Sequence, residues 1–138
     1  MTLTFTPLFA AVLAIVFMRL SMAVIGARQR AKVAVGDGGD EALRRAIRVH
    51  ANFIEYTPLC LLLLALAELN GVHAALICVA GALLLIGRLT HAHGMGQTPE
   101  PIHLRRRGMQ MTIFALIGSV ALSVWGVVRH LVGTPFGI

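Results

Sequence analysis

The sequence predicts an all-α integral membrane protein: a single domain, residues 1–138, built as a bundle of four transmembrane helices. Three observations support this fold class. Hydrophobic residues make up 57% of the chain and charged residues only 13%, a composition far from that of soluble globular domains. The apolar residues gather in four stretches, each near the roughly 20 residues needed to cross a bilayer. A length of 138 residues suits one domain.

The first predicted span covers about residues 3–25 and contains one charged residue, Arg19. Basic residues follow this span, at Arg28, Arg30 and Lys32, and none precedes it. A secretory signal peptide would carry its positive charge before the apolar segment. We therefore expect the first span to be retained as a membrane helix.

The remaining spans differ in polarity. They are predicted at about residues 43–69, 72–92 and 107–130. The second span is polar in its first half, and the third carries Arg88 and His91 near its end. The fourth contains an uncharged stretch over residues 108–128. The connections are a tight loop with the sequence GDGG, a short Asn-Gly turn and an irregular segment with two prolines and two glycines.

The positive charges lie mainly at one end of the predicted bundle. Those at the ends joined by the first and third connections are Arg28, Arg30, Lys32, Arg44, Arg45, Arg48, Arg88, Arg105, Arg106 and Arg107. Because cytoplasmic loops are enriched in Lys and Arg, both termini are predicted on the non-cytoplasmic side. The net charge of +6 is thus explained by topology, so we expect membrane lipids and no nucleic acid as partners.

A polar stripe opens the second span. Helical steps of three and four residues place five side chains on one face: Glu41, Arg45, Arg48, Asn52 and Glu55. Glu55 lies roughly 10 Å below Arg48 along the helix, and an ionisable group at that depth is expected to face the bundle interior. Two interpretations follow. Glu55 forms an internal salt bridge with Arg48 or Arg88, or the stripe binds a ligand that carries both carboxylates and an ammonium.

Further polar groups belong to the same end of the bundle. Arg88 and His91 are three residues apart and share a helical face, and the fourth span begins with Arg105–Arg107. An arginine triplet at a helix end is typical of a lipid-phosphate anchor. An arginine directed into the bundle would instead lower the pKa of a bound thiol. His91 and His93 fall on different helical faces, so we expect no metal site.

Small residues and cysteines predict packing. Small side chains recur every four residues at Ala74, Cys78 and Ala82, and again at Ala115, Ser119 and Ser123. Such stripes let helices approach closely in lipid. Cys60 and Cys78 each stand alone in an apolar run and are expected to be buried thiols.

These motifs resemble the MAPEG family, the membrane-associated proteins in eicosanoid and glutathione metabolism. The resemblance rests on RxHxNFxEYxP at residues 48–58, GRxxH at residues 87–91 and the basic start of the fourth span. Within the family, the chain is similar to a compact bacterial branch, which implies the bacterial inner membrane. It also implies a homotrimer, with glutathione bound between neighbouring subunits near the cytoplasmic side.

The resemblance further implies roles for individual residues. Arg48, Asn52 and Glu55 would contact glutathione, and His91 would belong to the same pocket. Arg107 aligns with the thiolate-stabilising arginine, with Arg105 as the alternative. The remaining candidates for glutathione contact are Arg45, Arg88 and, near the end of the first span, Arg30, with Arg28 as its alternative.

The implied function is a glutathione-dependent transferase or peroxidase that acts on lipophilic electrophiles or lipid hydroperoxides. The sequence departs from the eicosanoid enzymes at three positions. Ala51 stands where they carry an arginine, and Met95 and Met111 fall near two of their tyrosines. Tyr56 is the single tyrosine of this chain. These departures leave open a non-catalytic lipid-binding or scaffold protein of the same fold.

Overall fold

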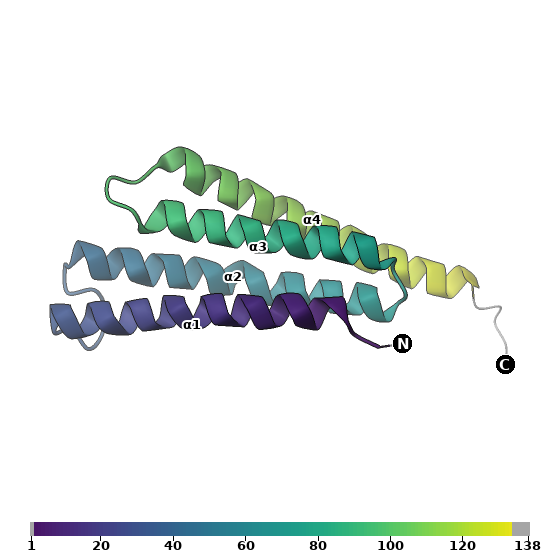
Figure 1. Cartoon of the computed structure of the whole chain (residues 1–138), viewed down its shortest axis with the longest axis horizontal. Coiled ribbons are helices and arrows are strands. Elements are labelled where there is room, and N and C mark those ends of the chain that lie inside the picture. The colour runs from purple at the N-terminus through teal and green to yellow at the C-terminus, as the bar shows by residue number, and fades with distance from the viewer. Residues whose placement is uncertain (1, 134–138) are drawn as a thin grey trace.

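The computed structural model describes residues 2–133 and folds them into a bundle of four helices (Figure 1). They are α1 (Phe5–Ala31), α2 (Glu41–Leu69), α3 (Ala74–Gly96) and α4 (Ile102–Gly133). Each helix is long and apolar enough to cross a membrane. The predicted all-α integral membrane fold with four spans is confirmed. Residues 1 and 134–138 of the predicted domain lie outside the described residues.

All four helices are longer at the charged end than their apolar stretches predict, α1 and α4 most of all. α1 continues to Ala31 rather than ending near residue 25, and α4 begins at Ile102 rather than near residue 107. Arginine is a good helix former, so a helix does not end where its apolar run ends. The arginine triplet Arg105–Arg107 therefore lies inside the first turns of α4.

The connection between α1 and α2 is the tight loop that its glycines predict. Gly36, Gly38 and Gly39 all have positive φ angles, a backbone region that glycine adopts without strain. Asp40 then caps α2 by accepting a hydrogen bond from the amide of Leu43 at 2.7 Å. This cap satisfies one of the free amides of the first turn of α2.

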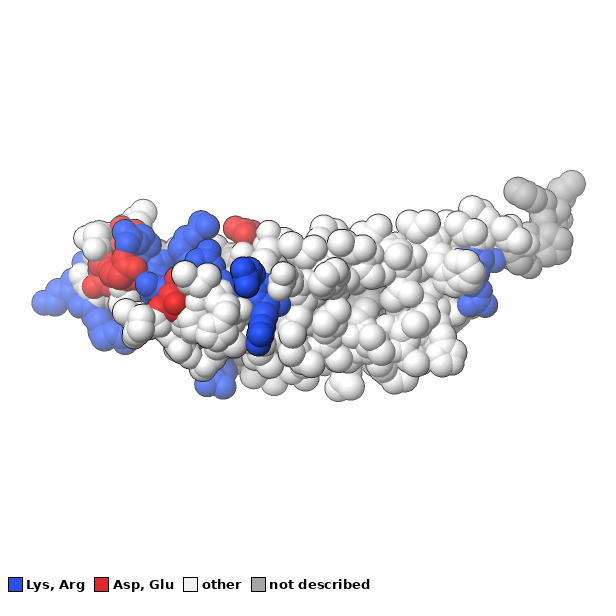
Figure 2. All heavy atoms as spheres, turned by 90° about the horizontal axis from the view of Figure 1, so that it is seen from above, with Lys and Arg blue, Asp and Glu red and all other residues white. Residues whose placement is uncertain are grey.

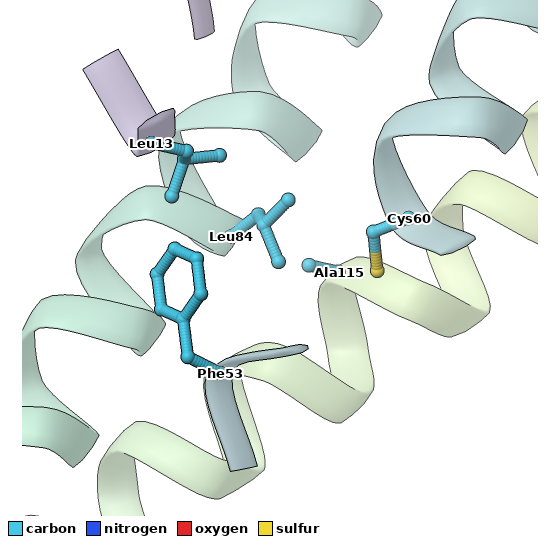
Figure 3. Close-up of a cluster of buried hydrophobic side chains, with 5 residues drawn as sticks. All are labelled: Leu13, Phe53, Cys60, Leu84 and Ala115. Atoms are coloured by element: carbon cyan, nitrogen blue, oxygen red, sulfur yellow. The ribbon is translucent and has the colours of Figure 1, made fainter. Parts of the chain in front are cut away.

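The core runs through all four helices (Figure 3). One buried cluster consists of Leu13, Phe53, Cys60, Leu84 and Ala115. The Cys60 thiol is buried, as predicted, whereas Cys78 is only half-buried. Within the described residues, α1 packs against α2 and α3 but does not contact α4.

Glycines bring α3 and α4 unusually close at the charged end. A Cβ atom on Gly94 would lie 2.7 Å from the amide nitrogen of Arg105, and one on Gly108 would collide with the backbone of His91. A Cβ atom on Gly87 would lie 2.9 Å from Thr112 Oγ1. Close backbone approach through small residues is how helices associate in lipid.

The predicted small-residue stripes are only partly correct. Ala115 and Ser119 of α4 are buried, as expected, whereas Ser123 is half-exposed. The stripe on α3 is wrong, because Ala74, Cys78 and Ala82 are half-exposed. The face of α3 that packs most tightly instead carries the glycines, which permit a closer approach than alanine does.

A buried carboxylate near the end of α2 contacts the start of α1. Glu68, near the end of α2, accepts hydrogen bonds from the amides of Thr4, Phe5 and Thr6 at 2.7, 2.8 and 2.8 Å. These are free amides at the start of α1, where the helix dipole also favours a negative charge. Glu68 thus fixes α1 against α2 at the end opposite the charged groups.

Candidate functional site

Most of the charged side chains gather at one end of the molecule, a long uncharged surface follows, and a small basic patch lies at the other end (Figure 2). Figure 1 shows that the α1–α2 and α3–α4 connections lie together at one end, while the N-terminus and the α2–α3 connection lie at the other. The antiparallel order of the helices therefore brings basic residues from distant parts of the sequence into one region. This region is the candidate site.

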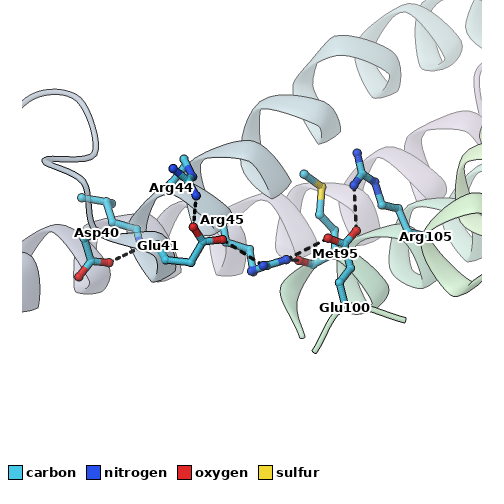
Figure 4. A network of polar contacts seen from close by, with 8 residues as sticks. Asp40, Glu41, Arg44, Arg45, Met95, Glu100 and Arg105 are labelled. Atoms are coloured by element: carbon cyan, nitrogen blue, oxygen red, sulfur yellow. Dashed lines mark hydrogen bonds and ion pairs between the residues drawn. The ribbon is translucent and has the colours of Figure 1, made fainter. Parts of the chain in front are cut away.

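Glu100 joins two helices at the charged end (Figure 4). Its carboxylate pairs with Arg45 of α2 at 3.1 Å and with Arg105 of α4 at 2.9 Å. Glu41 pairs in turn with Arg45 at 3.1 Å and with Arg44. The hydrogen bond from Arg105, with that from Arg45, lowers the pKa of Glu100 below its usual value. Glu100 therefore remains an anion at neutral pH.

Two cavities adjoin this ionic network. The histidine cavity has a volume of about 430 Å³ and is lined by Asn52, His91, Glu100, Ile102, Arg105, Arg106 and Met109. The arginine cavity has a volume of about 350 Å³ and is lined by Glu41, Arg44, Arg45, Arg48, Met95, Glu100 and Arg105. Glu100 and Arg105 line both, so we treat the two as one polar cleft. Its dimensions suit a small-molecule ligand.

Arg88 is the largest side chain that is fully buried, with 1% of its surface exposed. Its Nη1 donates to the backbone oxygen of Asn52 at 3.1 Å and to the side-chain Oδ1 of Asn52 at 2.8 Å. Its Nε donates to Thr112 Oγ1 at 2.9 Å, and the guanidinium lies over the Tyr56 ring at 5.7 Å. Arg88 lines neither cavity of the polar cleft, so within one chain it supports Asn52 from behind.

His91 lines the histidine cavity, and a hydrogen bond to the backbone of α4 fixes its ring. Its Nδ1 lies 3.1 Å from the backbone oxygen of Arg105. A carbonyl oxygen can only accept, so this contact assigns the proton to Nδ1 and leaves a lone pair on Nε2. His91 is 4% exposed, and its Nε2 has no hydrogen-bond partner among the described residues. The structure thus brings His91 and Asn52, distant in sequence, to one cavity.

Glu55 does not face the bundle interior, and that prediction is wrong. Both Glu55 and Arg48 are exposed on the surface of the chain, whereas Asn52 between them is half-buried. The internal salt bridge is also wrong, since within the described part of the chain Glu55 pairs with neither Arg48 nor Arg88. The polar stripe lies at the edge of the packed face of α2, so its members alternate between interior and exterior.

The arginines at the helix ends differ in position. Arg105 and Arg106 line the histidine cavity, whereas Arg107 is exposed and lines neither cavity. Arg30 is likewise exposed and lines neither cavity. Its alternative, Arg28, donates to the backbone oxygens of the α1–α2 loop. Within one chain, Arg30 and Arg107 are thus separate from the polar cleft.

Several residues of the site were not anticipated from the sequence. Glu100 bridges two arginines, Thr112 accepts from Arg88, and Met109 lines the histidine cavity. Glu100 alone had a signal, as an acidic residue a few positions before an arginine triplet. Thr112 lies in an apolar stretch, and nothing in the pattern of that stretch indicates a role for a single threonine.

An apolar cavity of about 310 Å³ lies between α1 and α2. Its lining includes Leu13, Phe17 and Phe53, and Thr57 is its one polar residue. No charged residue lines it among the described residues. This cavity therefore has no part in the polar site.

Comparison with known proteins agrees with this architecture. Residues 6–125 match the MAPEG family. The chain is 36% identical over 120 residues to the inner membrane protein YecN of Escherichia coli K12, which covers 87% of this chain and 90% of that protein. The protein of the same name from Escherichia coli O6:H1 strain CFT073 gives the same identity and coverage. The region matched by the family includes residues of all four helices and ends within α4.

Proposed function

We propose that this chain, which belongs to the MAPEG family, is a glutathione-dependent transferase or peroxidase of the bacterial inner membrane. Its acceptors would be lipophilic electrophiles or lipid hydroperoxides that enter from the bilayer. The proposal is carried by the polar cleft, where Asn52, His91 and Arg105 from three helices line one cavity at the charged end of a membrane bundle. The proposed inner-membrane location is supported by the relative with 36% identity, which is named an inner membrane protein.

The chemistry of the cleft suits glutathione, which carries two carboxylates, one ammonium and a thiol. Arg44, Arg45 and Arg48 line the arginine cavity and offer partners for carboxylates. Glu41 lines the same cavity and offers an anion for the ammonium. The exposed Glu55 lies outside both cavities of one chain and would meet the ligand only at a subunit interface. Asn52 supplies a neutral amide to the histidine cavity. These groups complement the carboxylates and the ammonium of the tripeptide.

Catalysis would come from electrostatic activation of the thiol. A cation beside the sulfur lowers the thiol pKa from about 8.5 and raises the fraction of the nucleophilic thiolate. The candidates for this cation remain Arg107 and Arg105. Arg105 lines both cavities of the cleft within one chain, whereas Arg107 points elsewhere. Arg107 can serve the reaction only from a neighbouring copy.

A homotrimer would complete the site. Glu55 and Arg48 are exposed, although charges in lipid cost several kcal/mol unless covered by protein or water. Arg30, near the end of α1, is exposed and lines neither cavity of the cleft within one chain. A neighbouring subunit supplies both the cover and the missing arginines. With the basic end cytoplasmic, both termini lie on the non-cytoplasmic side.

A second candidate function is non-catalytic lipid binding or scaffolding. One observation favours it: neither cavity of the cleft is lined by a Ser, Thr or Tyr hydroxyl. Met95 lines the arginine cavity, and the Tyr56 ring packs on Arg88 instead. A bound sulfur would thus lack a hydroxyl donor, and its activation would depend on arginine alone.

One experiment separates the two functions. Purified protein in detergent is titrated with glutathione and with S-methylglutathione while the thermal midpoint is followed, since a ligand of the folded state raises that midpoint. Conjugation of chlorodinitrobenzene and reduction of a lipid hydroperoxide are assayed in parallel. The proposed enzyme binds both peptides and turns over only with glutathione. Binding without turnover supports the scaffold, and no binding of either peptide rules out the glutathione site.

A further inference from the structure

Arg88 has an unusual position for an arginine in this molecule. It is buried, and it forms hydrogen bonds with side chains of α2 and α4. No carboxylate pairs with it among the described residues. Its strongest contacts are the two hydrogen bonds from Nη1 to Asn52 and the one from Nε to Thr112. Burying an unpaired cation costs free energy of desolvation. An apolar side chain would fill the same space without that cost, so packing alone does not explain an arginine here.

The hydrogen bonds of Arg88 determine the orientation of the Asn52 amide. Guanidinium groups have only donors, so the atom of Asn52 that faces Arg88 must be the oxygen. The amide nitrogen Nδ2 then lies on the other side of the group. Nδ2 donates to no acceptor among the described residues, and Asn52 lines the histidine cavity. Asn52 therefore presents a hydrogen-bond donor, and not an acceptor, to the histidine cavity.

We infer that Arg88 is a positioning residue, which holds the Asn52 amide so that Nδ2 donates to a carbonyl or carboxylate oxygen of the ligand. Arg88 does not itself line the cleft and acts through Asn52. The inference rests on the proposed function, because it assigns the role of one side chain in the glutathione site. It explains why a buried arginine, with its planar set of donors, occupies this position. A lysine ammonium could not donate to Asn52 and Thr112 in the same geometry.

Two variants test this assignment against a matched control. Asn52→Asp keeps the size of the side chain and pairs with Arg88 as an ion pair, but it has no donor for the ligand. Arg88→Lys keeps the charge but loses the double contact. Glu68→Gln weakens the α1 cap at the far end of the bundle and leaves the site untouched. Each protein is measured for its thermal midpoint and for its glutathione dissociation constant in detergent.

The expected results separate binding from stability. Asn52→Asp retains the wild-type midpoint while its dissociation constant rises at least about tenfold, which corresponds to the loss of one charge-assisted hydrogen bond. Arg88→Lys weakens binding several-fold. Glu68→Gln lowers the midpoint with an unchanged dissociation constant. The assignment is overturned if Asn52→Asp binds as the wild type does, or if Arg88→Lys and Glu68→Gln weaken binding equally at equal loss of midpoint.

A second readout does not need glutathione. The side-chain ¹⁵N–¹H₂ signals of Asn52 are identified in the unliganded protein by their absence from Asn52→Asp. Arg88→Lys must shift or broaden these signals, because the amide loses the donor that holds it. Unchanged signals overturn the positioning role even if the wild type binds glutathione. A wild type that does not bind glutathione, but whose Asn52 signals respond to Arg88→Lys, removes the proposed function and keeps the positioning of Asn52.

Discussion

The carboxylate of Glu68 and the backbone amide of Thr6 lie 2.8 Å apart, although 62 residues separate them in the chain. The same carboxylate accepts from the amides of Thr4 and Phe5. One side chain at the end of α2 thus caps the start of α1. This matters because α1 has few other fixed contacts: it packs on α2 and α3 only, within the described residues, and most of its surface faces outward.

We therefore predict a graded loss of stability at Glu68. Glu68→Ala leaves three amides without their acceptor and should reduce the free energy of unfolding by about 1–3 kcal/mol. Glu68→Gln keeps one oxygen and should lie between Ala and the wild type. Thermal midpoints in one detergent measure the order. Equal midpoints for all three proteins would show that the cap does not hold α1.

The pH dependence of the cleft should follow Glu100. Its pKa is lowered by Arg105 and then Arg45, so its contribution to stability is full above the ordinary carboxyl pKa of about 4.3. That contribution is lost as the pH falls through the lowered pKa of the folded state. We expect the thermal midpoint of the wild type to fall in this acid range more than that of Glu100→Gln. Parallel acid profiles for the two proteins would contradict the role of the bridge.

Two glycines of α4 should respond to alanine with opposite signs. A Cβ atom on Gly108 would collide with the His91 backbone, whereas one on Gly118 would meet nothing within 4 Å. Gly108→Ala should destabilise the protein by about 1–3 kcal/mol through overpacking. Gly118→Ala should stabilise it by about 0.5–1 kcal/mol, since alanine is the better helix former. The thermal midpoint of each variant, compared with that of the wild type, tests these predictions. An unchanged midpoint for Gly108→Ala would mean that α3 and α4 do not approach this closely.

The division of the site between subunits can be tested by mixing variants. If Arg107 of one copy serves the cleft that contains Asn52 of its neighbour, Arg107→Ala and Asn52→Asp should each lose most activity as pure proteins. Co-expressed with different tags and purified through both, they should regain part of it, because some interfaces then contain both native residues. A site built within one chain gives no recovery. Arg105→Ala, whose residue lines the cleft with Asn52, should not complement Asn52→Asp if Arg105 acts within its own chain.

Periodicity predicted which residues could share a site but not which of them point inward. Helical spacing places Asn52 and Glu55 on adjoining parts of one face, and yet Asn52 is half-buried and Glu55 exposed. The boundary between them is set by where α3 and α4 cover α2. Which residues of α2 are covered depends on how α3 and α4 pack against it. The sequence pattern of α2 alone does not contain this information.

The sequence by itself determined the number of helices, their order, the segregation of charge and the end of the bundle where polar groups gather. These follow from hydropathy, helical period and loop composition, all of which are local properties of the chain. Tertiary structure alone decided that Arg88 holds Asn52, that Glu100 joins Arg45 to Arg105, and that Glu68 caps α1. Each depends on how the helices pack together, which no local property of the chain contains. Between α3 and α4, that packing includes the close backbone approach at their glycines.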